Sequence, residues 1–177
     1  IRANRPQSRR VRTIPLVHNK MEMAAPEPQH EILILLDETT LLDDNLKASL
    51  ASITRSLIRP GVRFSVLSFS AFAQGRYLYR RAAGVVEFPL PEKVRPSIGV
   101  KILKSFDACM AGQGRYALDL VFKAEKLALD QASADLKKSD VIASLTDVSR
   151  LAKSSTAQRK TVLVVSDMLE NSSISSF

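Results

Sequence analysis

The sequence predicts an α/β fold built on a mainly parallel sheet, with helices on both faces and one antiparallel edge strand. Residues 32–36 and 161–166 are short apolar runs without polar alternation, which is typical of strands buried on both faces. Each run leads directly into an aspartate, Asp37 or Asp167, and helical patterns separate the two runs. This order of elements favours an α/β domain over an all-helical or all-strand one.

The first half of the predicted domain follows from local patterns. Leucine and isoleucine at spacings of three and four predict a helix over residues 42–57, which Pro60-Gly61 ends. Residues 63–69 and 76–80 read as strands. Because the connection between them is short, we expect an antiparallel hairpin.

The second half predicts two helices and a last strand. Apolar residues recur along one side of residues 115–137, and Ser139-Asp140 is a plausible cap for a helix that reaches Leu151. Gly112 and Gly114 predict a loop before the first of these helices. Together these elements give a Rossmann-like arrangement.

Composition is that of an ordinary globular domain, except for the placement of charge. The chain has 177 residues, 45% of them hydrophobic, and a net charge of +8. Six basic and two acidic side chains fall among residues 1–30, which also contain four prolines. We therefore expect a basic arm or linker over residues 1–30 and an α/β domain, either whole or truncated, over residues 31–177.

The basic arm is a candidate binding element. Its arginines would suit nucleic acid, an anionic membrane surface or an acidic partner, although such terminal segments are more often solvated tails or linkers. The candidate contacts are Arg2, Arg5, Arg9, Arg10 and Arg12. The expected location is the cytoplasm, and a membrane anchor upstream of Ile1 is also compatible with the sequence.

Two classes of site are disfavoured by composition. One cysteine allows no internal disulfide and no cysteine-rich zinc site. Both histidines, His18 and His30, precede the predicted sheet, which argues against a Ser-His-Asp triad. Asp37 and Asp167 remain, because ligands of open α/β sheets bind outside the carboxyl ends of the strands.

The residues around these aspartates resemble the von Willebrand factor A (VWA) domain, and in particular uncharacterised bacterial VWA-like proteins. The family places Asp-x-Ser/Thr-x-Ser after its first strand, a Thr or Ser before a later helix, and an Asp after its fourth strand. Asp37, Thr39, Ser139 and Asp167 match this pattern, whereas Leu41 stands at the position of the second serine. The resemblance covers roughly residues 31–173 and implies a degenerate metal-ion-dependent adhesion site.

The resemblance implies Mg²⁺ or Mn²⁺ at that site. Asp37, Thr39, Ser139 and Asp167 would supply carboxylate and hydroxyl oxygens, the ligands that Mg²⁺ prefers, and an acidic side chain of a partner protein would complete the coordination. The same residues also have structural interpretations. The hydroxyls are also suited to cap helices, and the two carboxylates are also suited to accept hydrogen bonds from loop amides.

The resulting expectation is a non-enzymatic VWA-like module or scaffold for protein–protein interaction, in which the degenerate site would make binding dependent on magnesium. The alternatives are a metal-dependent hydrolase or nuclease that uses an acidic cluster of Asp37 and Asp167 with Glu38 and Glu170, or a scaffold whose basic arm binds nucleic acid.

Overall fold

The protein has an α/β fold built on a mainly parallel sheet with one antiparallel strand. The computed structural model describes residues 27–71, 78–133, 135–136 and 138–172. In these residues the strands β1 (His30–Asp37), β2 (Val62–Phe69), β3 (Tyr79–Val86) and β4 (Arg159–Val165) form a sheet of order β3-β2-β1-β4. β1 pairs in parallel with β2 and β4, whereas β3 runs antiparallel to β2. The predicted fold class is confirmed.

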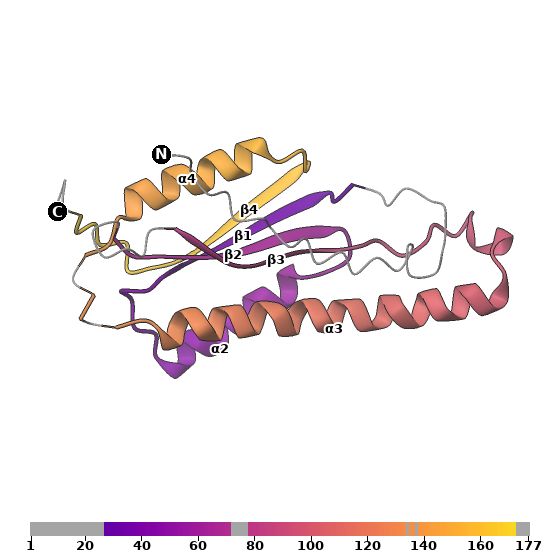
Figure 1. Ribbon diagram of the computed structural model, residues 1–177, viewed down its shortest axis with the longest axis horizontal. Coiled ribbons are helices and arrows are strands. Elements are labelled where there is room, and N and C mark those ends of the chain that lie inside the picture. The colour runs from indigo at the N-terminus through magenta and orange to yellow at the C-terminus, as the bar shows by residue number, and fades with distance from the viewer. Residues whose placement is uncertain (1–26, 72–77, 134, 137, 173–177) are drawn as a thin grey trace, which may run out of the picture.

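Helices cover both faces of the sheet, as expected. α2 (Asp44–Leu57) and α3 (Val100–Asp130) lie on one face, and α4 (Val141–Ser154) lies on the other (Figure 1). A short 3₁₀ helix, η2 (Arg95–Ser97), precedes α3. Among the described residues, no helix combines the length and apolar character that crossing a membrane requires.

β1 is the centre of the core because both of its faces are covered. All eight of its residues are buried. Ile32, Ile34 and Leu36 pack toward α2 and α3, while Leu33 and Leu35 pack toward α4. Since successive side chains of a strand point to opposite faces, a strand between two helical layers must be apolar at nearly every position. Burial of both faces therefore explains why the apolar run of β1 is unbroken.

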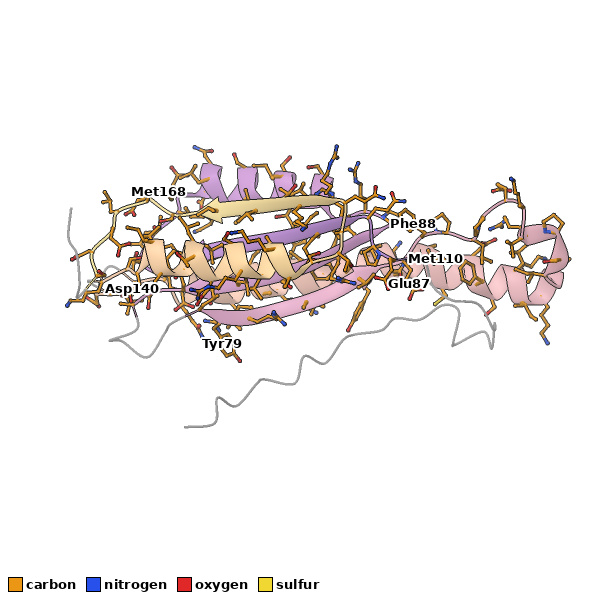
Figure 2. All side chains as sticks on the ribbon, turned by 90° about the horizontal axis from the view of Figure 1, so that it is seen from above. Tyr79, Glu87, Phe88, Met110, Asp140 and Met168 are labelled. Atoms are coloured by element: carbon orange, nitrogen blue, oxygen red, sulfur yellow. The ribbon has the colours of Figure 1, made fainter. Side chains whose placement is uncertain are left out.

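α3 extends well past the sheet and carries a small core of its own (Figure 1). There, Leu90 and Phe106 are buried together, with Ile98, Leu103 and Met110 packed against them. At the junction with the sheet, Gln113 Oε1 accepts a hydrogen bond from Glu87 N at 3.1 Å, and its Nε2 donates to Glu87 O at 3.3 Å. Figure 2 shows Glu87, Phe88 and Met110 at this junction.

The loop predicted around Gly112 and Gly114 is wrong, because both glycines lie inside α3. The helix also begins earlier and ends earlier than the predicted range of 115–137. Glycine is a local breaker signal, and here the apolar contacts of the helix on both sides outweigh it. The second strand of the hairpin is β3, displaced toward the C-terminus from the predicted 76–80, of which residues 76–77 lie outside the described residues.

The two glycines offer a direct test of this interpretation. A Cβ at position 112 or 114 would meet no atom within 4 Å. Replacing a glycine inside a helix by alanine removes backbone entropy from the unfolded chain, so we expect Gly112→Ala and Gly114→Ala each to raise the free energy of unfolding by about 0.5–1 kcal/mol. Denaturant unfolding followed by circular dichroism measures this.

Gly61 serves as the control, because alanine should be unfavourable at this position. Its φ is +83°, and a Cβ there would overlap the ring of Phe88. We therefore expect Gly61→Ala to lower the free energy of unfolding in the same assay. Equal responses at positions 61, 112 and 114 would contradict the assignment of residues 112 and 114 to a helix interior.

A buried carboxyl group joins α2 to α3. Glu125 is 4% exposed, and its Oε1 accepts a hydrogen bond from the Thr54 hydroxyl at 2.6 Å. Burial raises the pKa of Glu125 from 4.5 to about 7, and the Thr54 bond offsets part of this rise. Near neutral pH the native protein therefore holds a proton that the unfolded chain has already lost.

This pKa predicts a pH dependence of stability. Between pH 4.5 and about 7 the native state binds more protons than the unfolded state, so the free energy of unfolding falls as pH rises through this window. A shift of this size corresponds to roughly 3 kcal/mol. We expect Glu125→Gln to remove most of that fall, measured by urea unfolding at pH 4.5 and pH 8.

Asp130→Asn is the control, because Asp130 is an exposed carboxylate of the same helix, paired with Lys126. It should leave the pH dependence of the native protein unchanged. A Glu125→Gln variant that loses as much stability between the two pH values as the native chain would show that Glu125 is ionised in the folded protein.

Candidate functional site

The candidate site lies at the carboxyl end of β1, where the loops of three strands meet. The register pairs Asp37 with Phe69 of β2 and Leu36 with Val165 of β4. The residues that follow each strand therefore come together at one edge of the sheet. Asp37 is the last residue of β1 and is only 2% exposed.

Four hydrogen bonds converge on the Asp37 carboxylate. Its Oδ1 accepts from the backbone N of Thr39 at 2.9 Å and from the Thr39 hydroxyl at 2.6 Å. Its Oδ2 accepts from the hydroxyls of Ser139 at 3.0 Å and Ser166 at 2.8 Å. Each oxygen thus has two donors, which replace the water that a buried carboxylate loses.

These donors come from three segments, and two of them are also joined through their backbones. Ser139 and Asn171 exchange two backbone hydrogen bonds, each of 3.2 Å, which tie the segment before α4 to the segment after β4. Asp140 N donates to Ser70 O at 3.1 Å, which ties the same segment to the end of β2. The hydroxyls therefore sit on a braced framework, not on separate loops.

The turn after β4 places Asp167 away from the Asp37 carboxylate's hydrogen bonds. Asp167 is exposed, and its Oδ1 accepts from Leu169 N at 3.0 Å. Its backbone N donates to the Thr40 hydroxyl at 3.2 Å, so the turn still contacts the loop after β1. Met168 adopts a φ of 60°, a conformation that residues other than glycine rarely occupy. Strained backbone of this kind is often found at functional sites.

Glu38, the neighbour of Asp37, is held in a different way. It is 2% exposed and forms an ion pair with Arg81 of β3. The Arg81 guanidinium also donates to the Ser68 hydroxyl at 2.7 Å and lies 4.8 Å from the centre of the Tyr79 ring. Glu38 is therefore neutralised by a cation, whereas Asp37 is solvated by hydroxyls.

Unpartnered hydroxyl groups also lie at this end of the sheet. In the described residues, the buried Oγ atoms of Ser70 and Ser144 have no hydrogen-bond partner. Ser70 follows β2, and Ser144 is in the first turn of α4, where its N donates to Asp140 O at 3.0 Å. His30 lies at the opposite, amino end of β1. Burial lowers its pKa, and the nearby positive charges of Arg159 and Arg59 lower it further.

The structure brings three of the four predicted metal ligands together. Asp37, Thr39 and Ser139 are joined by hydrogen bonds, and Asp167 lies in the adjoining turn with its carboxylate bound to a loop amide. The expected hydroxyl caps are not formed. Asp43 caps α2 by accepting from Leu46 N at 2.8 Å, and Asp140 occupies the N-cap position of α4.

Sequence reasoning missed Ser166 as a member of the site. Its hydroxyl bonds Asp37 because the β1–β4 register places these two residues side by side. The sequence shows a hydroxyl residue immediately before Asp167. To recognise it as a partner of Asp37, however, one must know that β1 and β4 are neighbouring strands. The arm arginines Arg2, Arg5, Arg9, Arg10 and Arg12 lie outside the described residues.

Comparison with protein-family models, curated proteins and solved structures gave no significant match. The chemistry of the site must therefore be argued from its own atoms. Three of the four donors to Asp37 are hydroxyl groups, and together with the carboxylate they offer oxygen atoms, which suit Mg²⁺ better than zinc or copper. In the described part of the chain, no three histidine, cysteine or acidic side chains gather as a metal cluster, so the carboxylate charge available to a cation is small.

Large exposed apolar side chains lie in the two segments next to the polar centre. Leu41 is 61% exposed in the loop after β1, and Met168 and Leu169 are 54% and 63% exposed in the turn after β4. The Thr40–Asp167 hydrogen bond holds these two segments together. Figure 2 shows Met168 and Asp140 at the same end of the molecule. The site therefore combines a rigid polar centre with an exposed apolar rim, formed by Leu41, Met168 and Leu169.

Two buried serines test the importance of the Asp37 bonds. Ser139 is 3% exposed and donates to Asp37, whereas Ser144 is fully buried without a partner. Losing a hydrogen bond to a buried carboxylate costs about 1.5–3 kcal/mol, while removing an unpartnered hydroxyl is close to neutral. We expect Ser139→Ala to lower the free energy of unfolding by that amount and Ser144→Ala to leave it unchanged or raise it, in chemical denaturation. Equal losses in the two variants would contradict the network described here.

Proposed function

We propose that the chain is a non-enzymatic, VWA-like protein-interaction domain that binds its partner at the carboxyl end of the sheet. The observation that carries this proposal is the convergence of three hydroxyl groups, from three segments, on the buried carboxylate of Asp37. Such a centre is preorganised, because the segments that contribute to it are braced by backbone hydrogen bonds.

A divalent cation fits this proposal. The hydroxyl oxygens of Thr39, Ser139 and Ser166 and the Asp37 carboxylate would provide oxygen ligands for Mg²⁺ or Mn²⁺. Asp167, in the adjoining turn, would contribute directly or through water. An acidic side chain of the partner protein would then complete the coordination. This makes partner binding dependent on the metal.

The apolar rim supports an interaction surface in the same place. Leu41, Met168 and Leu169 expose large side chains around the polar centre. Exposed apolar groups at a rigid polar centre favour association with another protein, because binding removes them from water. The rim would therefore supply binding energy, and the polar centre would supply orientation.

The arrangement favours this function over a hydrolase. A two-metal hydrolase needs several carboxylates directed at one point. Here Glu38 is paired with Arg81, and Glu170 Oε2 accepts from Ile142 N at 2.9 Å. Asp167 is bound to Leu169 N. The acidic residues that would form a catalytic cluster are thus engaged with different partners.

Metal titration tests the proposal. Protein stripped with EDTA is titrated with Mg²⁺ and with Mn²⁺ while thermal unfolding is recorded. A ligand that binds only the native state stabilises it by about 2.7 kcal/mol at a hundredfold excess over its dissociation constant, so we expect the melting temperature to rise with metal concentration. Asp37→Asn should abolish this rise.

Two further variants make the titration specific. Ser166→Ala removes one oxygen ligand but leaves the Asp37 carboxylate and its three other hydrogen bonds in place, and it should weaken metal binding even if Asp37→Asn fails to fold. Asp44→Asn removes a carboxylate that is fully exposed on α2, and it should respond to metal like the native chain. A native protein that does not respond at millimolar metal, or an unchanged response in Ser166→Ala, would overturn metal-dependent binding at this site.

A further inference from the structure

The part of α3 that extends past the sheet ends in a compact tip, formed by residues 91–104 (Figure 1). η2 lies in this tip directly before α3, and its Arg95 donates to both carboxylate oxygens of Asp107 on α3, at 3.0 and 2.6 Å. Apolar side chains of the tip pack on the buried ring of Phe106. The tip is therefore a folded unit with a fixed surface.

Three lysine side chains of the tip are exposed, and none of them forms an ion pair with any of the described residues. They are Lys93, Lys101 and Lys104. The acidic side chains nearby are directed at another cation. Hydrogen bonds with Asp107 raise the pKa of Arg95, and the charge of Glu92 raises it further. The positive charge of the three lysines is therefore left for a partner.

The lysines of α3 are paired where the helix covers the sheet. Lys123 binds Asp119 at 2.7 Å, and Lys126 binds Asp130 at 2.6 Å. In each pair the two residues are four positions apart, a spacing at which opposite charges meet on the surface of a helix. The two lysines at the start of α3 have no such partner among the described residues. The unpaired lysines of this helix therefore lie at the tip.

Large apolar side chains lie beside these lysines. Val100 is 69% exposed and Ile102 is 44% exposed in the first turn of α3, on either side of Lys101 in the sequence. A bilayer that contains anionic lipids accepts both kinds of side chain, because its headgroups attract cations and the acyl boundary beneath them removes apolar groups from water. The tip therefore has the chemistry of a surface that binds an anionic membrane.

Other anionic or neighbouring partners use only part of this surface. Nucleic acid would bind the lysines through its phosphates but would leave Val100 and Ile102 in water. The tip of a second copy would bring lysine against lysine, which is repulsive. An anionic phospholipid surface uses both the charge and the apolar side chains.

We propose that the tip docks on an anionic phospholipid membrane, with its lysines at the headgroups and with Val100 and Ile102 at the boundary of the acyl chains. Figure 2 shows Met168 and Asp140, at the Asp37 end of the molecule, opposite to the extension of α3. A molecule docked by the tip therefore directs its Asp37 site away from the bilayer. The site stays accessible to a partner protein while the chain is on the membrane.

Cosedimentation of the full chain with phospholipid vesicles tests this proposal. We expect binding to vesicles of phosphatidylcholine and phosphatidylserine, weakened by added salt, and no binding to phosphatidylcholine alone. One lysine near an anionic surface contributes about fivefold in affinity, so Lys101→Gln combined with Lys104→Gln should weaken binding about 25-fold. Lys123→Gln combined with Lys126→Gln removes the same charge from the part of α3 that covers the sheet, and this variant should bind like the native chain.

The exposed valine separates a membrane from a soluble polyanion. Val100→Ser should weaken vesicle binding but leave binding to a fluorescent DNA duplex unchanged, whereas Leu127→Ser, at a leucine 49% exposed on the same helix, should alter neither. A native chain that does not bind phosphatidylserine vesicles, or a Lys101→Gln, Lys104→Gln chain that binds them equally well, would overturn the proposal. Native affinity in Val100→Ser would also overturn it and would assign the lysines to a soluble acidic partner. Because no metal is added, this result is independent of the titration at Asp37.

Discussion

The buried carboxylate of Asp37 determines how the loops at the carboxyl end of the sheet are arranged. Burying a charge is costly unless hydrogen bonds replace its water, and here donors from the loop after β1, the segment before α4 and the turn after β4 do so. Each donor fixes the position of its own segment. The same interaction that solvates the charge therefore determines how three distant parts of the chain meet.

Asp37 and Glu38 are both buried carboxylates, but different groups compensate their charges, and this difference bears on function. Glu38 is compensated by the Arg81 guanidinium, a fixed charge that also binds Ser68. Asp37 is compensated by neutral hydroxyls, whose oxygen atoms keep lone pairs that a cation can use. An arginine-paired carboxylate is closed to a metal, whereas a hydroxyl-bound one is not. This contrast separates a structural acid from the candidate binding site beside it.

The sequence by itself determined the α/β class, the buried β1 run and the placement of Asp37 at a strand end, because hydrophobic periodicity is a local consequence of burial. The expected burial of residues 161–166 on both faces is wrong, since every residue of β4 is exposed or half-buried. The sequence did not determine α3, since the glycines at 112 and 114 indicate a loop and only packing on both sides keeps them helical. It also missed Ser166 and the Arg81–Glu38 pair. Those contacts depend on which strands are neighbours and in what register, and only the tertiary structure decides that.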